Sequence, residues 1–322
     1  MGVSRRLVLF VIITLIAILP GCANKPSQSG DTTAGTEYMS ITDDGGRTVK
    51  LEHKPARTVV LSPSFLDILY TVDGTAVGRP STKNLDVPAA ARQVAEVGYV
   101  YNINMEKVVA LGPDLVIAFQ GMHEKLVPLL ESNHIPVILV KLKTYQDVLD
   151  KVRLFSAIAG TKDKGEQIAR QLEAEVRATT DKIPDKPVKV AILHATAKSV
   201  TVELENSIAG NVAKILKLSN IAEGSLPLEG DPDNTPFSLE KLVESDPDII
   251  FVTTMGKDPE IEKRMQTDVK SNPAWAGVKA VRNQKVYYLP QDLFLLNPGL
   301  KYPEAVEYMA SIAYPEVFGH EQ

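Results

Sequence analysis

Few residues in this sequence could carry out chemistry, and none of them completes a known catalytic motif. Cys22 is the only cysteine, so zinc sites built from several cysteines are excluded. His123 and Glu124 begin like the zinc-protease motif H-E-x-x-H, but Val127 stands where the second histidine should be. Phosphate-loop, dinucleotide-binding and G-x-S-x-G motifs are missing as well. These absences disfavour catalysis, although an active site made of residues scattered along the sequence stays open.

Two glutamates occupy the same place in an internal repeat. The segments "NMEKVVALGPDLVIA" (104–118) and "SLEKLVESDPDIIFV" (238–252) align without a gap, so that Glu106 falls on Glu240. Each segment predicts a short helix, a turn and a buried strand. An acidic residue near a helix N-terminus contributes about 0.3–1 kcal/mol, which is one sufficient reason for both glutamates. One repeat at so wide a spacing predicts two similar lobes.

The N-terminal residues have the pattern of a secretory leader. Two arginines precede an apolar run that is too short for a membrane span of roughly 20 residues. Cys22 follows directly after "LPG", which resembles the lipidation motif of bacterial lipoproteins. We therefore expect residues 1–21 to be a signal peptide and Cys22 to be the acylated N-terminus. Residues 22–37 are polar and rich in Ser, Thr and Gly, which predicts a lipidated flexible tether on the outer side of the cell membrane.

The remaining chain alternates strand-like and helix-like segments, which predicts an α/β fold. We expect two Rossmann-like lobes with parallel sheets, at 38–143 and 187–322. The segment 144–186 is rich in helix formers and predicts a long helix that joins the lobes, with a break at Gly160. In open α/β sheets ligands bind beyond the carboxyl ends of the strands. A ligand cleft is therefore expected between the lobes.

Composition narrows the class of partner. The chain has 322 residues and 44% hydrophobic content, enough for two ordinary domains. Its net charge is -5, and Lys and Arg are spread along the chain without a basic cluster. This disfavours nucleic acid as a partner.

Taken together, the sequence resembles the substrate-binding lipoproteins of ABC importers that take up iron-siderophore, haem or cobalamin. The resemblance is carried by residues 41–74, 97–118 and 238–252. It implies two lobes bridged by one long helix, no catalysis, no intrinsic cofactor, and a monomer that meets an ABC permease with its ATPase. It also implies that Glu106 and Glu240 contact arginines of the permease. The implied ligand is an iron chelate, either siderophore or haem, with cobalamin as the alternative.

Two other classes stay open: an enzyme that acts on a metal chelate, and an adhesion or assembly lipoprotein. Failure to bind any small molecule would favour the adhesion or assembly class, and turnover of a chelate would favour the enzyme.

The strand-end rule also selects candidate ligand-binding residues. They are Ser62, Ser64, Phe65, Tyr99, Tyr101, Phe119, Met122, His123, His194 and Met255, with Phe294 as a further candidate.

Among these, Tyr99 is the candidate iron ligand. In the haem-binding branch of the family a tyrosine follows a glycine and coordinates the iron, and Gly98-Tyr99 matches that arrangement. The alternative is an aromatic wall that stacks on a siderophore or corrin.

Overall fold

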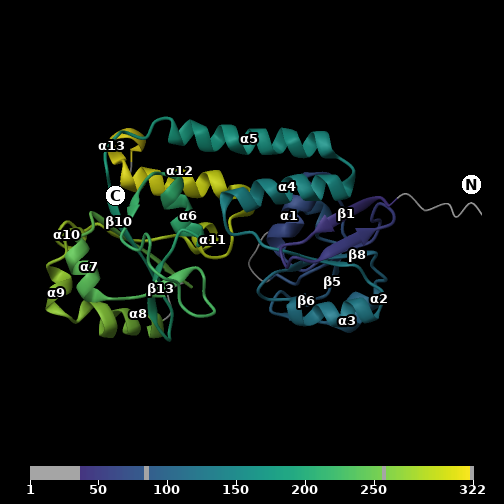
Figure 1. Cartoon of the computed structure of the whole chain (residues 1–322), viewed down its shortest axis with the longest axis horizontal. Helices are drawn as coiled ribbons and strands as arrows, with labels where there is room; N and C mark the ends of the chain where they lie inside the picture. The colour runs from purple at the N-terminus through teal and green to yellow at the C-terminus, as the bar shows by residue number, and fades with distance from the viewer. Residues whose placement is uncertain (1–36, 83–86, 256–258, 320–322) are drawn as a thin grey trace, which may run out of the picture. The chain divides into compact units, whose positions relative to one another are not determined.

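The structure is a computed structural model that describes residues 37–82, 87–255 and 259–319 (Figure 1). The predicted signal peptide, Cys22 and nearly all of the predicted tether lie outside the described residues.

The first sheet is parallel throughout. Its strand order is β5-β4-β3-β8-β9, with strands at Ala95–Glu96, Gly78–Arg79, Thr58–Val60, Leu115–Phe119 and Val137–Val140. Helices α1 (Pro63–Thr71), α2 (Met105–Ala110) and α3 (Val127–Ser132) connect the strands. Two small antiparallel hairpins accompany the sheet: β1 (Met39–Thr42) with β2 (Thr48–Leu51), and β6 (Gly98–Tyr99) with β7 (Asn102–Ile103). The runs of buried residues in β3, β8 and β9 suit strands covered on both faces.

The second sheet is mixed rather than wholly parallel. Its order is β13-β11-β10-β14-β15, with strands at Asn234–Pro236, Val200–Glu203, Lys189–Ala195, Ile249–Thr254 and Val286–Tyr288; β12 (Ser219–Asn220) also pairs with β10. The strands β10, β12, β14 and β15 run parallel, as the sequence predicts. However, β11 and β13 are antiparallel to their neighbours, because β11 returns directly from β10 through a short turn.

The helices of the second half are α6 to α13. Their bounds are Ile208–Ile215, Leu239–Ser245, Pro259–Met265, Pro273–Ala276, Lys279–Arg282, Gln291–Phe294, Tyr302–Ala313 and Pro315–Phe318. A π-helical stretch, Gln266–Lys270, continues α8, and 3-10 turns lie at Ala89–Ala91, Glu124–Leu126 and Gly299–Lys301.

Two helices, rather than one, make the connection between the sheets. Helix α4 (Tyr145–Ala159) begins with a capping box at Thr144 and Asp147 and ends at Gly160, whose φ of 72° is left-handed. Helix α5 (Lys162–Thr180) then folds back along α4 and continues past it toward the second sheet (Figure 1). The predicted break at Gly160 is therefore a sharp reversal, and α5 alone makes the long crossing.

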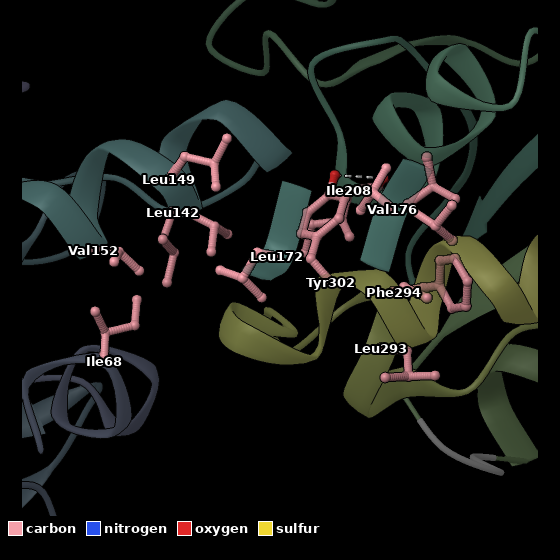
Figure 2. Close-up of a cluster of buried hydrophobic side chains, with 14 of the residues drawn as sticks. Ile68, Leu142, Leu149, Val152, Leu172, Val176, Ile208, Leu293, Phe294 and Tyr302 are labelled. Atoms are coloured by element: carbon pink, nitrogen blue, oxygen red, sulfur yellow. Dashed lines mark hydrogen bonds between the residues drawn. The ribbon is translucent and has the colours of Figure 1, made fainter. Parts of the chain in front are cut away.

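One hydrophobic core runs through both lobes. Side chains from α1, α4, α5, α6 and α12 pack with one face of each sheet, and part of this core is drawn in Figure 2. Tyr302 is fully buried there, and its hydroxyl donates to Asn211 Oδ1 at 2.9 Å. The opposite faces of the two sheets have separate cores, which include Val108 of α2 and Leu242 of α7. The α/β fold class predicted from sequence, with two lobes and a helical bridge, is confirmed.

Candidate functional site

A cavity of about 380 Å³ lies where strand ends of both sheets face each other. The first half of the chain contributes the start of α1, the β6–β7 turn, the last residue of β8 and the residues that follow β8 and β9. The second half contributes the ends of β10 and β11, the start of α6, the start of β13, and the end of α11 with the segment that follows it. The lining residues are Ser62, Pro63, Ser64, Val100, Phe119, Met122, Leu142, Lys143, His194, Glu203, Ser207, Ile208, Asp233, Asn234 and 294–297. This position agrees with the rule for open α/β sheets.

Two larger hollows lie elsewhere. One, of about 740 Å³, borders the α4–α5 reversal, and the other, of about 750 Å³, borders α6 and β12. Neither lies between the two sheets, and neither contains a residue that the strand-end rule selects. The smaller cavity is therefore the candidate ligand site, because it combines both lobes at the expected end of their strands.

Five of the residues selected from sequence line this cavity: Ser62, Ser64, Phe119, Met122 and His194. Phe294, the further candidate, lines it too. Ser64 Oγ donates to the backbone oxygen of Asn297 at 3.3 Å, so it joins the two halves of the wall. Met122 is 45% exposed and offers a flexible apolar contact.

Phe65 and Met255 lie elsewhere. Phe65 is fully buried in the core, where its ring packs edge-on against Phe119 at 5.5 Å and against Phe155 at 6.1 Å. It therefore supports the cavity residue Phe119 from behind. Met255 follows β14 directly and is 55% exposed, but it is not among the residues that line the cavity.

Tyr99 and Tyr101 flank the one residue of their hairpin that reaches the cavity, Val100. Their rings stack with centroids 5.8 Å apart and planes within 7°. Gly98 begins this hairpin with a φ of 105°, and a Cβ there would lie 2.5 Å from Asn102 O, so only glycine fits. The structure brings both tyrosines to the neighbourhood of the cavity without placing either on its wall.

His123 fixes this hairpin in position. Its side chain is buried, its Nδ1 accepts the Phe119 N–H at 3.0 Å, and its Nε2–H donates to Val100 O at 2.6 Å. Since one nitrogen accepts and the other donates, the ring is neutral. Burial lowers the pKa of His123, which favours the same state. Both nitrogens are thus occupied within the protein, and His123 links β8 to the hairpin that carries Tyr99.

The opposite wall contains a chain of hydrogen bonds that the sequence did not reveal. His194 Nδ1 lies 2.9 Å from Thr253 Oγ1, and the Thr253 hydroxyl donates to Glu203 Oε1. Glu203 ends β11 and is only 4% exposed. Burial raises the pKa of Glu203 to about 7, while hydrogen bonds from Ser207 and Thr253 act against this shift. Burial also lowers the pKa of His194, so this imidazole is neutral near pH 7.

Ion pairing and hydrogen bonding cross the cavity from one half of the chain to the other. Lys143, just after β9, forms an ion pair with Asp233, which precedes β13. The Asn297 side-chain amide donates to Leu142 O. Glu203, Lys143 and Asn297 were missed in the sequence because no motif connects them and only the fold brings them together. A glutamate at the end of an apolar strand, as in "VTVE", was the one available signal.

Glu106 and Glu240 occupy equivalent exposed positions, each second in its helix. Asn104 caps α2 by accepting the Lys107 N–H, and Ser238 caps α7 through the Lys241 N–H. Both helices pack on the face of their sheet opposite the shared core, so both lie on the side away from α5 (Figure 1).

The described residues lack both the side-chain clusters that hold metal ions and the long apolar helices that span membranes. Among the residues that the structure describes, no group of three or more His, Cys, Asp or Glu side chains could hold a metal ion. Within the same ranges, no helix is long and apolar enough to span a bilayer.

Curated proteins of similar sequence cover nearly the whole chain. A putative ABC transporter substrate-binding lipoprotein, YhfQ of Bacillus subtilis, is 26% identical over 304 residues, covering 91% of this chain and 93% of that protein. The Fe(3+)-citrate-binding protein YfmC of the same organism is 25% identical over 311 residues, covering 94% and 95%. The iron(3+)-hydroxamate-binding protein FhuD, also from B. subtilis, is 25% identical over 310 residues, covering 90% and 91%.

Solved structures share the fold. An ABC transporter substrate-binding protein from Listeria monocytogenes aligns with a TM-score of 0.72 at 22% identity, covering 81% of this chain and 99% of that one. S. aureus IsdE complexed with heme aligns with a TM-score of 0.69 at 22% identity, covering 80% and 98%.

The family profile described as "Periplasmic binding protein" matches residues 58–293, most of the chain. This match confirms the resemblance and the expectation of a transport binding protein rather than an enzyme. By this match the chain belongs to the periplasmic binding protein family.

Proposed function

We propose that this chain is the extracytoplasmic substrate-binding component of an ABC importer and that it captures an iron chelate, siderophore or haem. The observation that carries the proposal is the cavity of about 380 Å³ bounded by strand ends of both sheets. The names of similar proteins support the ligand class, since they include an Fe(3+)-citrate-binding protein, an iron(3+)-hydroxamate-binding protein and a haem complex.

In this proposed function the protein is anchored to the outer side of the cell membrane and delivers its ligand to an ABC permease. Cys22 is the acylated N-terminus, residues 22–37 are the tether, and the mature protein is a monomer with lobes at 38–143 and 187–322 and a bridge at 144–186. An ABC permease with its ATPase receives the ligand, and Glu106 and Glu240 contact that permease. The mass of the N-terminal peptide from membrane-extracted protein tests the anchor, because unmodified Cys22 would contradict it.

Within this function, Tyr99 is the proposed iron ligand if the cargo is haem. Its support is the sequence spacing and its place beside Val100, which lines the cavity. Phenolate oxygen is an established haem ligand. Titration of haem into the wild type and Tyr99→Phe tests the role: an unchanged charge-transfer band in the variant would contradict coordination by Tyr99.

The function itself is tested by titrating the purified protein with a panel of ferric chelates and haem, and by measuring each binding affinity by calorimetry. Met122→Trp places a bulkier side chain at the cavity and should weaken the bound chelate at least tenfold. Leu129→Trp is a matched control, because Leu129 is also 45% exposed but lies on α3, away from the cavity. Equal affinity in the two variants would contradict binding in this cavity, and no binding by the wild type would contradict the function.

A further inference from the structure

The charges around the cavity indicate which kind of chelate it accepts. Among the cavity-lining residues that the structure describes, the titratable ones are Lys143, His194, Glu203 and Asp233. Arginine is missing from the lining in these ranges, and Lys143 is the one cation on it. Because Lys143 is already paired with Asp233, it has little charge left to offer a ligand.

The negative charges outnumber this single cation. Asp231 lies behind Asp233, and its Oδ1 accepts the Asp233 N–H at 3.2 Å while its Oδ2 accepts from Asn234 Nδ2 at 3.0 Å. Lys143 compensates Asp233, but among the described residues no lysine, arginine or histidine forms an ion pair with Asp231. Glu203 adds further negative charge whenever it is ionised, and its nearest basic neighbour is the imidazole of His194 at 3.7 Å.

Glu203 is the feature that separates this arrangement from an ordinary solvated acidic surface. Its side chain is almost wholly buried, yet it contributes to the cavity wall. Burying a carboxyl group beside two other carboxylates is unfavourable unless hydrogen bonds or an opposite charge compensate it. Thr253 and Ser207 supply hydrogen bonds to Glu203, and a cationic or N–H-bearing ligand would supply the opposite charge or further donors.

We propose that the cavity selects a neutral or cationic ferric chelate, with an ammonium or amide N–H facing Glu203 and Asp233, over an anionic carboxylate chelate. This selectivity rests on the proposed function. An anionic chelate would bring its own carboxylates next to Glu203, Asp231 and Asp233 without an available arginine or lysine. Juxtaposed like charges in a desolvated site are costly, so charge discriminates strongly here.

Three ferric chelates of different net charge test the selectivity. They are ferrioxamine B, a trihydroxamate chelate with a free ammonium; its N-acetylated derivative, which is neutral; and ferric citrate, which is anionic. We expect the full-length mature protein to bind the cationic chelate most tightly and ferric citrate at least tenfold more weakly than either hydroxamate. Ferric citrate bound as tightly as the hydroxamates would overturn the selectivity while leaving the proposed function intact.

Variants assign the effect to the named carboxyl groups. Glu203→Gln should reduce the preference for the cationic over the neutral hydroxamate severalfold, and Asp233→Asn, which releases Lys143, should also strengthen binding of ferric citrate. Glu205→Gln is the matched control, because Glu205 is two residues away, exposed and paired with Lys214 outside the cavity. Unchanged charge preference in both cavity variants would overturn the proposal. If none of the three probes and no haem binds to the wild type, the proposed function fails and the selectivity fails with it.

Discussion

Asp114 and Asp248 make the same contact in the two lobes. The Asp114 carboxylate accepts the backbone N–H of Arg57 at 2.9 Å, and the Asp248 carboxylate accepts that of Lys189 at 2.9 Å. In return, each aspartate N–H donates to the backbone oxygen of the same partner. The repeated Pro-Asp step therefore fixes the start of β8 against β3 and the start of β14 against β10. The internal repeat is thus a structural element as well as a carrier of Glu106 and Glu240.

Loss of this contact should destabilise either lobe. Asp114→Ala removes the acceptor for the N–H groups of Ala56 and Arg57, and Asp248→Ala removes it for Lys189. We expect each variant to lower the free energy of unfolding by about 1–2 kcal/mol, measured by urea denaturation. Asp185→Ala, in the exposed loop after α5, serves as the control and should have little effect. Wild-type stability in both variants would contradict a structural role for the repeat.

The close approach of α4 and α5 depends on Gly165. A Cβ at Gly165 would lie 2.0 Å from Ser156 Oγ and 2.4 Å from Ser156 Cβ, so the helices would have to move apart. Gly165→Ala should therefore lower stability by about 1–3 kcal/mol, even though alanine is the better helix former. The same change in a Ser156→Gly background should be less costly. Thermal unfolding of the four proteins checks this, and equal costs in both backgrounds would show that the contact is unimportant.

The buried carboxyl group of Glu203 predicts a pH dependence of stability. Its pKa is about 7 in the folded chain, against an ordinary value of 4.5, so the folded state holds an extra proton between these values. The free energy of unfolding should therefore fall as pH rises from about 4.5 to 7, by up to roughly 3 kcal/mol, and level off above that range.

Comparison with Glu203→Gln isolates this contribution. Nearby His194 has the opposite effect, because burial lowers its pKa, and Asp231, Asp233 and Lys143 also face Glu203. Urea unfolding at pH 5, 6, 7 and 8 should show that the variant gains stability relative to the wild type as pH rises. A constant difference across this range would contradict the raised pKa.

Charge reversal at Glu106 and Glu240 tests docking to the permease. Either Glu106→Lys or Glu240→Lys would place like charges together at the expected interface, which can cost several kcal/mol. We expect at least a tenfold loss of transport in reconstituted vesicles with no change in chelate affinity. Glu244→Lys, another exposed position on α7, is the matched control. Normal transport by the double variant Glu106→Lys/Glu240→Lys would exclude the docking role.

Sequence reasoning predicted the features that depend on local pattern. Alternating strands and helices, the repeat and the break at Gly160 are all encoded within short segments, and each appears in the structure. The antiparallel course of β11 was missed, because strand direction depends on pairing rather than on composition. The strand-end rule selected half of the residues that the first half of the chain contributes to the cavity wall. The rule selected Phe65, but Phe65 lies on the face of α1 that packs into the core, and a rule based on strand ends does not say which face of a helix is buried. The rule also could not detect Glu203, Lys143 and Asn297, because these residues come from segments far apart in the sequence.

In the proposed function, an iron chelate binds in the cavity between the two sheets. Anomalous diffraction at the iron edge, on crystals grown with the tightest-binding chelate, locates the metal directly. We expect one strong iron peak in that cavity, between Met122 on one wall and His194 and Glu203 on the other. An iron peak in the hollow beside α6 and β12, or at the α4–α5 reversal, would contradict binding between the sheets.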